Sequence, residues 1–171
     1  MGYIEAAQKS ADIFRRNRLR IVDVTDPADL IALVAASSEE SRYQRFHTGM
    51  ADLRPVMAEQ LTQANGRALG LRSRSGRLVA EARYTHTSGD EAEVAILVAD
   101  KYQGRGLGTA LMALVFQQAA ADGIGTVTAE VLGSNDAMMA VFQRLAPVEL
   151  MGMVEGTQHI RMPLGEVAAA A

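Results

Sequence analysis

The sequence contains no cysteine. This absence excludes disulfides, cysteine-ligated zinc and a covalent cysteinyl intermediate. No run of roughly 18 apolar residues is present, so no membrane-spanning helix is expected. Residues 1–20 place their charge after their apolar residues and lack a hydrophobic core segment, which argues against a signal peptide and favours the cytoplasm. The net charge of −3 shows no basic excess, so neither nucleic acid nor a membrane is an expected partner.

The apolar content is 49% over 171 residues, enough for one domain with a full hydrophobic core. We expect this domain over residues 19–165, with a helical extension over 1–18 and a frayed tail over 166–171. Apolar residues recur at helical spacing in the extension, from Ile4 to Phe14. This spacing predicts a helix packed on its own domain, with a dimer contact as an alternative.

Alternating apolar residues and turn residues divide the rest of the chain. Strands are predicted over residues 19–24, 67–74, 77–87, 92–99, 126–132, 149–154 and 158–162, and helices over 28–36, 53–64, 107–121 and 136–145. Residues 37–50 are polar and are expected to be irregular. The order indicates a mixed α/β (α+β) fold with hairpins in the middle and at the end, rather than a repeating βαβ series.

A glycine-rich turn joins the predicted strand 92–99 to the predicted helix 107–121. It consists of Gln103, Gly104, Arg105, Gly106, Leu107, Gly108 and Thr109. Glycines let the backbone turn sharply and approach a ligand closely. The first N–H groups of a helix lack intrahelical partners and favour an anion. The turn is therefore predicted to bind a phosphate-bearing ligand, with a purely structural turn as the alternative.

Two nucleotide-binding interpretations of this turn fit poorly. A P-loop requires a lysine before its serine or threonine, whereas Gly108 is followed directly by Thr109. A dinucleotide fingerprint requires glycine or alanine three residues after its second glycine, where this chain again has Thr109. The acid that such a site places at the end of the next strand would here be Glu130, which lies in the middle of the predicted strand.

Gln103, Gly106 and Gly108 match the pattern Gln/Arg-x-x-Gly-x-Gly/Ala. On this pattern, on its place between the fourth strand and the third helix, and on Asn135 after the fifth strand, residues 19–163 resemble the GNAT superfamily of acyl-CoA-dependent N-acyltransferases. The resemblance implies a mixed, mostly antiparallel sheet of about six to seven strands, splayed between strands 4 and 5 and flanked by about four helices.

The same resemblance implies acetyl-CoA as the cofactor. In the family, amides of the turn hold the pyrophosphate of coenzyme A, and amides of the preceding strand, here around Leu97 and Val98, pair with the pantetheine arm. Asn135, Met138 and Phe142 complete the cofactor site that the resemblance implies. It implies no metal.

Residues 38–46, SEESRYQRF, resemble a Ser-x-x-Ser-Arg-Tyr-x-Arg-Phe segment of bacterial GNAT protein-lysine acetyltransferases. The resemblance implies that Arg42, Tyr43, Arg45 and Phe46 line the acceptor side, and that the acceptor is a protein lysine, for example of an acyl-CoA ligase. The alternative is that both arginines are solvated surface residues and that Tyr43 and Phe46 anchor the loop.

Amine acetylation requires a base, because a protonated amine has no lone pair. Glu93 lies ten residues before Gln103, close to where the family's protein-lysine enzymes carry a glutamate. We expect it to be partly desolvated in a cleft and to act as the general base. Glu91 is a rival on the same strand, and Glu81 and His86 are weaker candidates. The backbone N–H of Val98 is expected to polarise the thioester carbonyl.

The chain departs from the family at Phe142, where many members carry a tyrosine that protonates the leaving thiolate. Water, the displaced amine, Tyr84 and Tyr102 are the remaining proton donors. The predicted function is N-acetyl transfer from acetyl-CoA to a protein lysine. The alternatives are a small-amine acetyltransferase and an acyl-CoA-binding sensor with little turnover.

Overall fold

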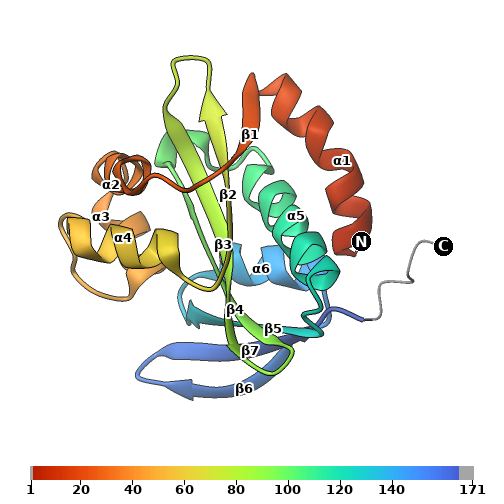
Figure 1. Cartoon of the computed structure of the whole chain (residues 1–171). Coiled ribbons are helices and arrows are strands. Elements are labelled where there is room, and N and C mark those ends of the chain that lie inside the picture. The colour runs from red at the N-terminus through yellow and green to blue at the C-terminus, as the bar shows by residue number, and fades with distance from the viewer. Residues whose placement is uncertain (1, 166–171) are drawn as a thin grey trace.

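A seven-stranded sheet carries the fold in the computed structural model, which describes residues 2–165. The strand order is β1-β2-β3-β4-β5-β7-β6 (Figure 1). The strands are β1 (Leu19–Asp23), β2 (Gly66–Ser73), β3 (Leu78–Ser88), β4 (Glu91–Val98), β5 (Thr126–Leu132), β6 (Glu149–Val154) and β7 (Thr157–Pro163). The pair β4–β5 is parallel and the other neighbouring pairs are antiparallel. This confirms the predicted mixed, mostly antiparallel sheet.

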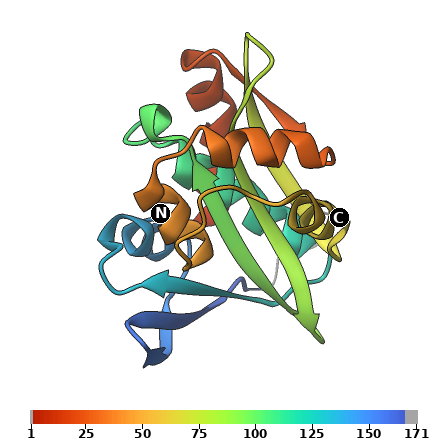
Figure 2. The ribbon, with the colours of Figure 1, turned by 90° about the vertical axis from the view of Figure 1, so that its left-hand side faces the viewer.

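Helices cover both faces of the sheet. Residues 2–165 hold α1 (Tyr3–Arg16), α2 (Pro27–Ala35), α3 (Glu39–Phe46), α4 (Pro55–Gln63), α5 (Leu107–Ala121) and α6 (Asp136–Leu145), with a short 3-10 turn η1 (Asp100–Tyr102). Helices α2, α3 and α4 lie on one face, and α1 and α5 lie on the other (Figures 1 and 2). Two hydrophobic clusters, one against each helical layer, form the core.

The expectation that residues 37–50 are irregular is wrong, because α3 occupies Glu39–Phe46. Within α3, Ser41 alone is buried, so the helix has no apolar stripe from which a sequence pattern could predict it. It is held by local capping instead. The Ser38 side chain accepts a hydrogen bond from Ser41 N–H, and His47 ends the helix in the left-handed conformation, with φ 55°.

Strands β4 and β5 pair only at their beginnings. Their register runs Glu91 with Thr126, Ala92 with Val127 and Glu93 with Thr128, and the strands then diverge. On its other edge, β4 stays paired with β3 as far as Val98. The predicted splay between the fourth and fifth strands is confirmed, and Glu93 stands at its vertex.

The splay leaves backbone groups of β4 free on one side. Just after β4, Ala99 N–H donates to the carbonyl oxygen of Val79 on β3. Because successive residues of a strand point their N–H groups to opposite edges, the N–H groups of Ile96 and Val98 face the splay. The amide of Leu97 faces β3 by the same alternation, so of the two amides predicted to pair with the pantetheine arm only that of Val98 is free to do so.

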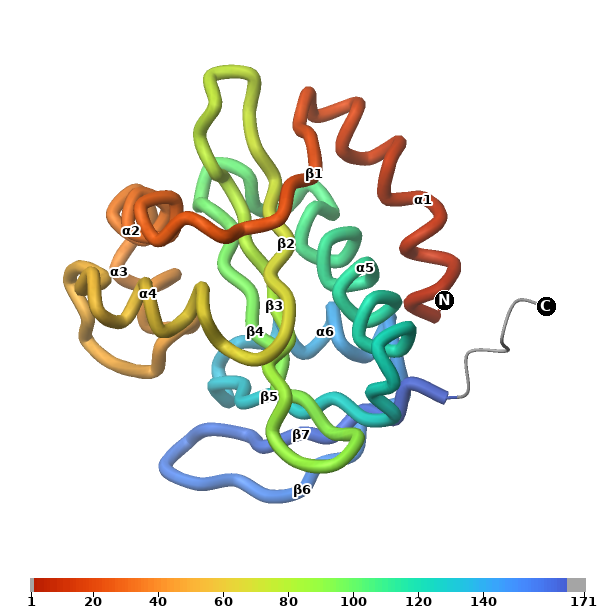
Figure 3. Tube along the Cα trace, viewed as in Figure 1, coloured from red at the N-terminus to blue at the C-terminus, as the bar shows by residue number. Residues whose placement is uncertain are grey.

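Helix α1 packs against α5 and belongs to the same core (Figure 3). Tyr3 and Phe14 are 5% and 4% exposed. The Tyr3 hydroxyl donates to Leu164 O over 3.2 Å, which ties the first helix to the end of the described chain. The extension is thus a helix packed on its own domain. The predicted tail, residues 166–171, lies outside the described residues.

Candidate active site

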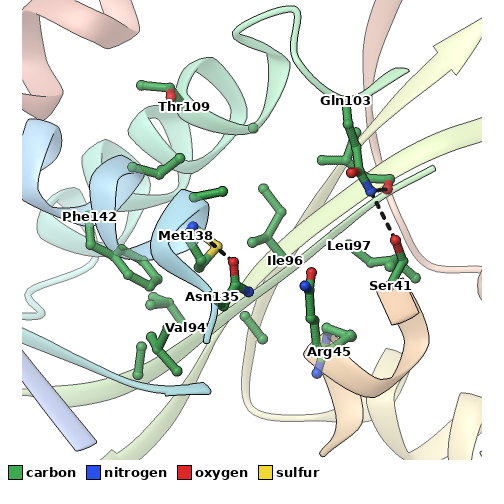
Figure 4. A pocket seen from close by; sticks show the side chains of 18 of the residues that line it. Ser41, Arg45, Val94, Ile96, Leu97, Gln103, Thr109, Asn135, Met138 and Phe142 are labelled. Carbon is green, nitrogen blue, oxygen red and sulfur yellow. Dashed lines mark hydrogen bonds between the residues drawn. The ribbon is translucent and has the colours of Figure 1, made fainter. Parts of the chain in front are cut away.

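A cavity of about 630 Å³ occupies the splay between β4 and β5. Strand β4, the glycine turn, helix α3 and the β5–α6 segment form its wall. Figure 4 shows Gln103 and Ser41 on one side of this cavity and Asn135, Met138 and Phe142 on the other. Fourteen residues predicted from the sequence lie in this wall: Arg45, Phe46, Glu93, Leu97, Val98, Gln103, Gly104, Gly106, Leu107, Gly108, Thr109, Asn135, Met138 and Phe142.

The glycine turn has the geometry of an anion site. Gly104 and Gly106 have φ values of 70° and 74°, which side-chain-bearing residues rarely adopt. The first intrahelical bond of α5 runs from Ala110 N–H to Gly106 O. The N–H groups of residues 107–109 therefore have no helical partner within the described chain, and the positive end of the helix dipole lies behind them. The turn can bind an anion such as a pyrophosphate.

The side chains of Gln103 and Arg105, both in the turn, have different surroundings. Gln103 Nε2 donates to Val98 O over 2.9 Å and to Ser41 Oγ over 3.0 Å, so it joins the turn to β4 and to α3. Arg105 lies outside the cavity wall, and its assignment to the cofactor site stays a prediction. It donates to Lys101 O and lies 5.3 Å from the Tyr102 ring.

The far wall of the cavity comes from the start of α6. Asn135 caps this helix, because its Oδ1 accepts a hydrogen bond from Met138 N–H over 3.1 Å. Phe142 is 2% exposed and stacks on Phe116 at 6.3 Å between ring centroids. Phe142 is thus both a core residue and part of the cavity wall, so the wall is apolar at the position of the family tyrosine.

Carboxylates line the end of the cavity near the vertex of the splay. Glu93 is exposed there and makes no hydrogen bond or ion pair within the described residues, so the expected partial desolvation is wrong for this structure. Glu130, on β5, also lines the cavity and lies 3.7 Å from His47 Nδ1 and 3.4 Å from His159 Nδ1. Among residues 2–165, no group of three His, Asp or Glu side chains has the arrangement of a metal site.

The rival bases lie outside the cavity wall. Glu91 is paired with Arg161 at 3.1 Å, and Glu81 is 2% exposed and paired with Arg83. His86 packs edge-on against the Tyr84 ring. Burial and the hydrogen bond to Asp122 raise the pKa of Tyr84, which also makes this hydroxyl a poor proton donor for the cavity.

A network of hydrogen bonds fastens α3 to the segment before the glycine turn. Asp100 accepts from Ser38 N–H over 2.7 Å, from Ser38 Oγ, and from Ser41 Oγ over 2.9 Å. Burial acts to raise the pKa of Asp100, but these hydrogen bonds outweigh it and hold the pKa below its ordinary value. The two serines of the SEESRYQRF segment thus hold α3 against Asp100, just before the glycine turn. Ser41 Oγ also accepts the hydrogen bond from Gln103 Nε2.

The other residues predicted for the acceptor side divide into two pairs. Arg45 and Phe46 line the cavity. Arg42 does not, because it donates to Ser37 O over 2.8 Å and to Met50 O over 3.1 Å and so closes the loop around α3. Tyr43 is 44% exposed and also lies outside the wall.

A family model described as "Acetyltransferase (GNAT) family" matches residues 31–146. The chain belongs to this family. As a GNAT acetyltransferase it is an acyl-CoA-dependent N-acyltransferase, and acetyl-CoA is its cofactor. The unpartnered N–H groups of the turn and of the splayed strand fit the pyrophosphate and the amide-containing arm of that molecule.

Named GNAT relatives are similar to different lengths of the chain. Acetyltransferase Pat of Mycolicibacterium smegmatis is 39% identical over 75 residues, which are 43% of this chain and 22% of that protein. The GNAT domain of S. lividans PAT is 28% identical, with a TM-score of 0.73 over 85% of this chain and 89% of that chain. A Sinorhizobium meliloti phosphinothricin acetyltransferase, solved in complex with AcCoA, is 17% identical, with a TM-score of 0.68 over 90% and 92%.

Several residues of the GNAT site could not be assigned from the sequence. Ser41, His47 and Glu130 line the cavity. Glu130 lies two residues after Thr128, which pairs with Glu93 in the parallel register, so Glu130 and Thr128 are on the same face of the sheet. This two-residue spacing is the sequence signal from which Glu130 could have been placed in the site. The bond between Ser41 and Gln103 joins residues 62 positions apart, and no spacing rule predicts such a pair.

Within residues 2–165, no helix is both long and apolar enough to cross a membrane.

Proposed function

We propose that this GNAT protein acetylates lysine side chains of a protein, such as an acyl-CoA ligase. The SEESRYQRF segment supports this acceptor, because it resembles a segment of bacterial protein-lysine acetyltransferases and forms helix α3, which contributes to the cavity wall. The similarity to Pat of M. smegmatis and to the GNAT domain of S. lividans PAT supports it further. The chain spans about a fifth of the curated relative's length, so the proposal concerns the activity of this domain.

Glu93 is the general base of the proposed reaction. It is the carboxylate at the vertex of the splay, and its oxygens are free of ion pairs within the described chain. It accepts a proton from the lysine ammonium, so that the amine nitrogen gains the lone pair with which it bonds to the acetyl carbon. The bond from that carbon to sulfur breaks in the same transfer.

Strand β4 supplies the hydrogen-bond donor that polarises the thioester carbonyl in the proposed mechanism. The N–H groups of Ile96 and Val98 both face the splay. Ile96 is nearer to Glu93 along β4, so its N–H, rather than that of Val98 as the sequence predicted, donates to the oxygen of the reacting carbonyl, where negative charge develops, and the N–H of Val98 is left for the pantetheine arm. Tyr102 is the tyrosine of the cavity wall, and with water and the attacking amine nitrogen, which must lose its second proton as the amide forms, it is a remaining proton donor for the leaving thiolate. Phe142 has no proton to give, so this step differs from that of members with tyrosine there.

The direct test is acetylation of candidate acyl-CoA ligases by the purified protein and acetyl-CoA, with modified lysines mapped by mass spectrometry. A polyamine panel is run in parallel. We expect lysine modification to exceed polyamine turnover. The reverse result would favour a small-amine acetyltransferase, and acetyl-CoA binding without product would favour a sensor.

The Glu93→Gln variant tests the base. We predict unchanged acetyl-CoA affinity and a loss of turnover of about 10²-fold or more, because proton removal from the ammonium becomes slow. Glu91→Gln is the matched control, since Glu91 lies on the same strand but is paired with Arg161 outside the cavity. Equal turnover of Glu93→Gln and Glu91→Gln would remove Glu93 from the mechanism.

A further inference from the structure

Arg45 is placed at the acceptor end of the cavity. It belongs to the last turn of α3, which packs on β4. Its neighbour Phe46 packs in the cluster that includes Leu97, and Leu97 shares a strand face with Glu93. Arg45 and Glu93 therefore line the same side of the cavity, where the amine is to enter.

The Arg45 guanidinium has no hydrogen-bond or ion-pair acceptor within residues 2–165, and its Cζ lies 4.8 Å from the centroid of the Phe46 ring. Its Nε is buried without a hydrogen bond, and no ion pair involves this residue. Arg42, one turn earlier, uses its donors on main-chain carbonyls, and Arg83 uses Nε on Glu81 and Nη1 on Leu61 O. Arg83 Nη2 is likewise buried without a hydrogen bond. Arg45 differs from both neighbouring arginines in that none of its side-chain donors makes a hydrogen bond within the described residues.

The surroundings of Arg45 make its unbonded Nε–H energetically unfavourable in the absence of a ligand. Burial lowers the pKa of the Arg45 guanidinium, and the charges around it are those of Glu81, Arg83 and Glu93. Glu81 is already paired with Arg83. A buried N–H without an acceptor costs free energy that a ligand oxygen would recover, and a guanidinium suits a carbonyl or a carboxylate.

We propose that Arg45 binds an oxygen atom of the acceptor, from a carbonyl or a carboxylate, while the acceptor amine lies against Glu93. The site then selects amines that also carry such an oxygen over simple alkylamines. This inference rests on the proposed function and specifies its substrate. The oxygen has two possible sources, the main-chain carbonyl of a lysine within a protein and the carboxylate of a free amino acid.

The test compares kcat/KM for three amines at saturating acetyl-CoA. Nα-acetyl-lysine methylamide offers carbonyl oxygens alone, and Nα-acetyl-lysine adds a carboxylate. Pentylamine has the same alkyl chain and terminal amine but no oxygen atom. We expect Arg45→Met to lower kcat/KM for one or both lysine derivatives by about 10- to 100-fold and to change pentylamine by less than about threefold. A loss confined to Nα-acetyl-lysine identifies a carboxylate as the ligand, and a loss with the methylamide identifies a carbonyl.

Two further variants keep the test decisive. Arg45→Lys retains the charge without the planar fork and should recover part of the preference, and it serves if Arg45→Met does not fold. Arg42→Met is the matched control, because Arg42 binds only main-chain oxygens; it should leave the ratio between lysine derivative and pentylamine unchanged. Acetyl-CoA affinity by calorimetry checks that each variant retains the donor site.

The outcomes separate the two proposals. An equal loss for lysine derivatives and pentylamine in Arg45→Met would overturn the role of Arg45 and leave the proposed lysine acetylation intact. A wild-type protein that binds acetyl-CoA but acetylates no amine would overturn the proposed function and this inference together.

Discussion

At the scale of single residues, the glycine turn combines a backbone requirement with a need for space. Gly106 has φ 74°, and a Cβ added there would meet no atom of the described chain within 4 Å. Gly108 has no such backbone constraint. Its Cβ would lie 3.8 Å from Ile96 Cδ1 and Val98 Cγ2, an ordinary contact, on the cavity wall. Conformation therefore selects glycine at 106, and room for the ligand selects it at 108.

This distinction predicts different effects of valine at the two positions. Gly108→Val should weaken acetyl-CoA binding by about 10-fold or more and change the free energy of unfolding by less than about 1 kcal/mol, because its methyl groups enter the cavity. Gly106→Val should weaken binding and also cost about 1–2 kcal/mol of stability. Calorimetry with acetyl-CoA and urea unfolding measure the two quantities.

Gly76 provides the control for the backbone effect. It has φ 82° in the β2–β3 turn, away from the cavity, so Gly76→Val should cost stability and leave acetyl-CoA affinity unchanged. Wild-type affinity in both Gly106→Val and Gly108→Val would show that acetyl-CoA does not contact the turn.

At the scale of secondary-structure elements, the position of α3 depends on Asp100. This carboxylate receives hydrogen bonds from the two serines at the start of α3, and α3 carries Arg45 and His47 into the cavity. We predict that Asp100→Asn raises the KM for the amine by about 3- to 10-fold, with a smaller effect on acetyl-CoA, and costs about 1 kcal/mol of stability. Steady-state kinetics with each substrate varied in turn measures the difference.

The sign of the pH dependence follows from the lowered pKa of Asp100. A carboxyl whose pKa is lower in the folded state stabilises the fold above its unfolded pKa, ordinarily 3.8, and loses this contribution as the pH falls through the folded value. The stability difference between wild type and Asp100→Asn should therefore be full near pH 6 and shrink below 3.8. Asp12→Asn, at an exposed pair with Arg15, is the control and should show little difference at either pH. A constant gap between wild type and Asp100→Asn at all pH values would argue against an ionised Asp100 in this network.

The elements that the sequence predicted well are those with their own periodicity and caps. Helices over 107–121 and 136–145 agree with the structure at both ends, because glycine or asparagine precedes each and an apolar stripe or core runs through it. Helix α3 was missed because its stability comes from Ser38, Asp100 and Arg42 rather than from an apolar face. The anion-binding turn could also be predicted, because it is one continuous segment with a recognisable glycine spacing. The convergence of α3, β4 and β5 around Glu93 could not, because it is a tertiary contact between segments far apart in the sequence.

At the scale of the whole molecule, α1 supports the layer that holds the donor side of the cavity. The Tyr3 ring lies edge-on to Phe116 on α5 at 6.0 Å, and Phe116 stacks on Phe142 of the cavity wall. A continuous row of aromatic rings thus runs from the first helix to the site. Helix α5 also begins at the glycine turn, so its position on α1 and on the sheet fixes where the turn lies.

If α1 unfolds together with the rest of the domain, a core substitution in it must destabilise the whole protein. Phe14 is 4% exposed, and Phe14→Ala should cost about 3–5 kcal/mol of the free energy of unfolding. Ile4, 47% exposed on the same helix, is the control, and Ile4→Ala should cost less than about 1 kcal/mol. Urea unfolding followed by circular dichroism gives both values. A Phe14→Ala variant as stable as Ile4→Ala, or one that loses helical signal in a separate early transition, would mean that α1 unfolds independently of the domain and that the aromatic row does not tie it to the acetyl-CoA site.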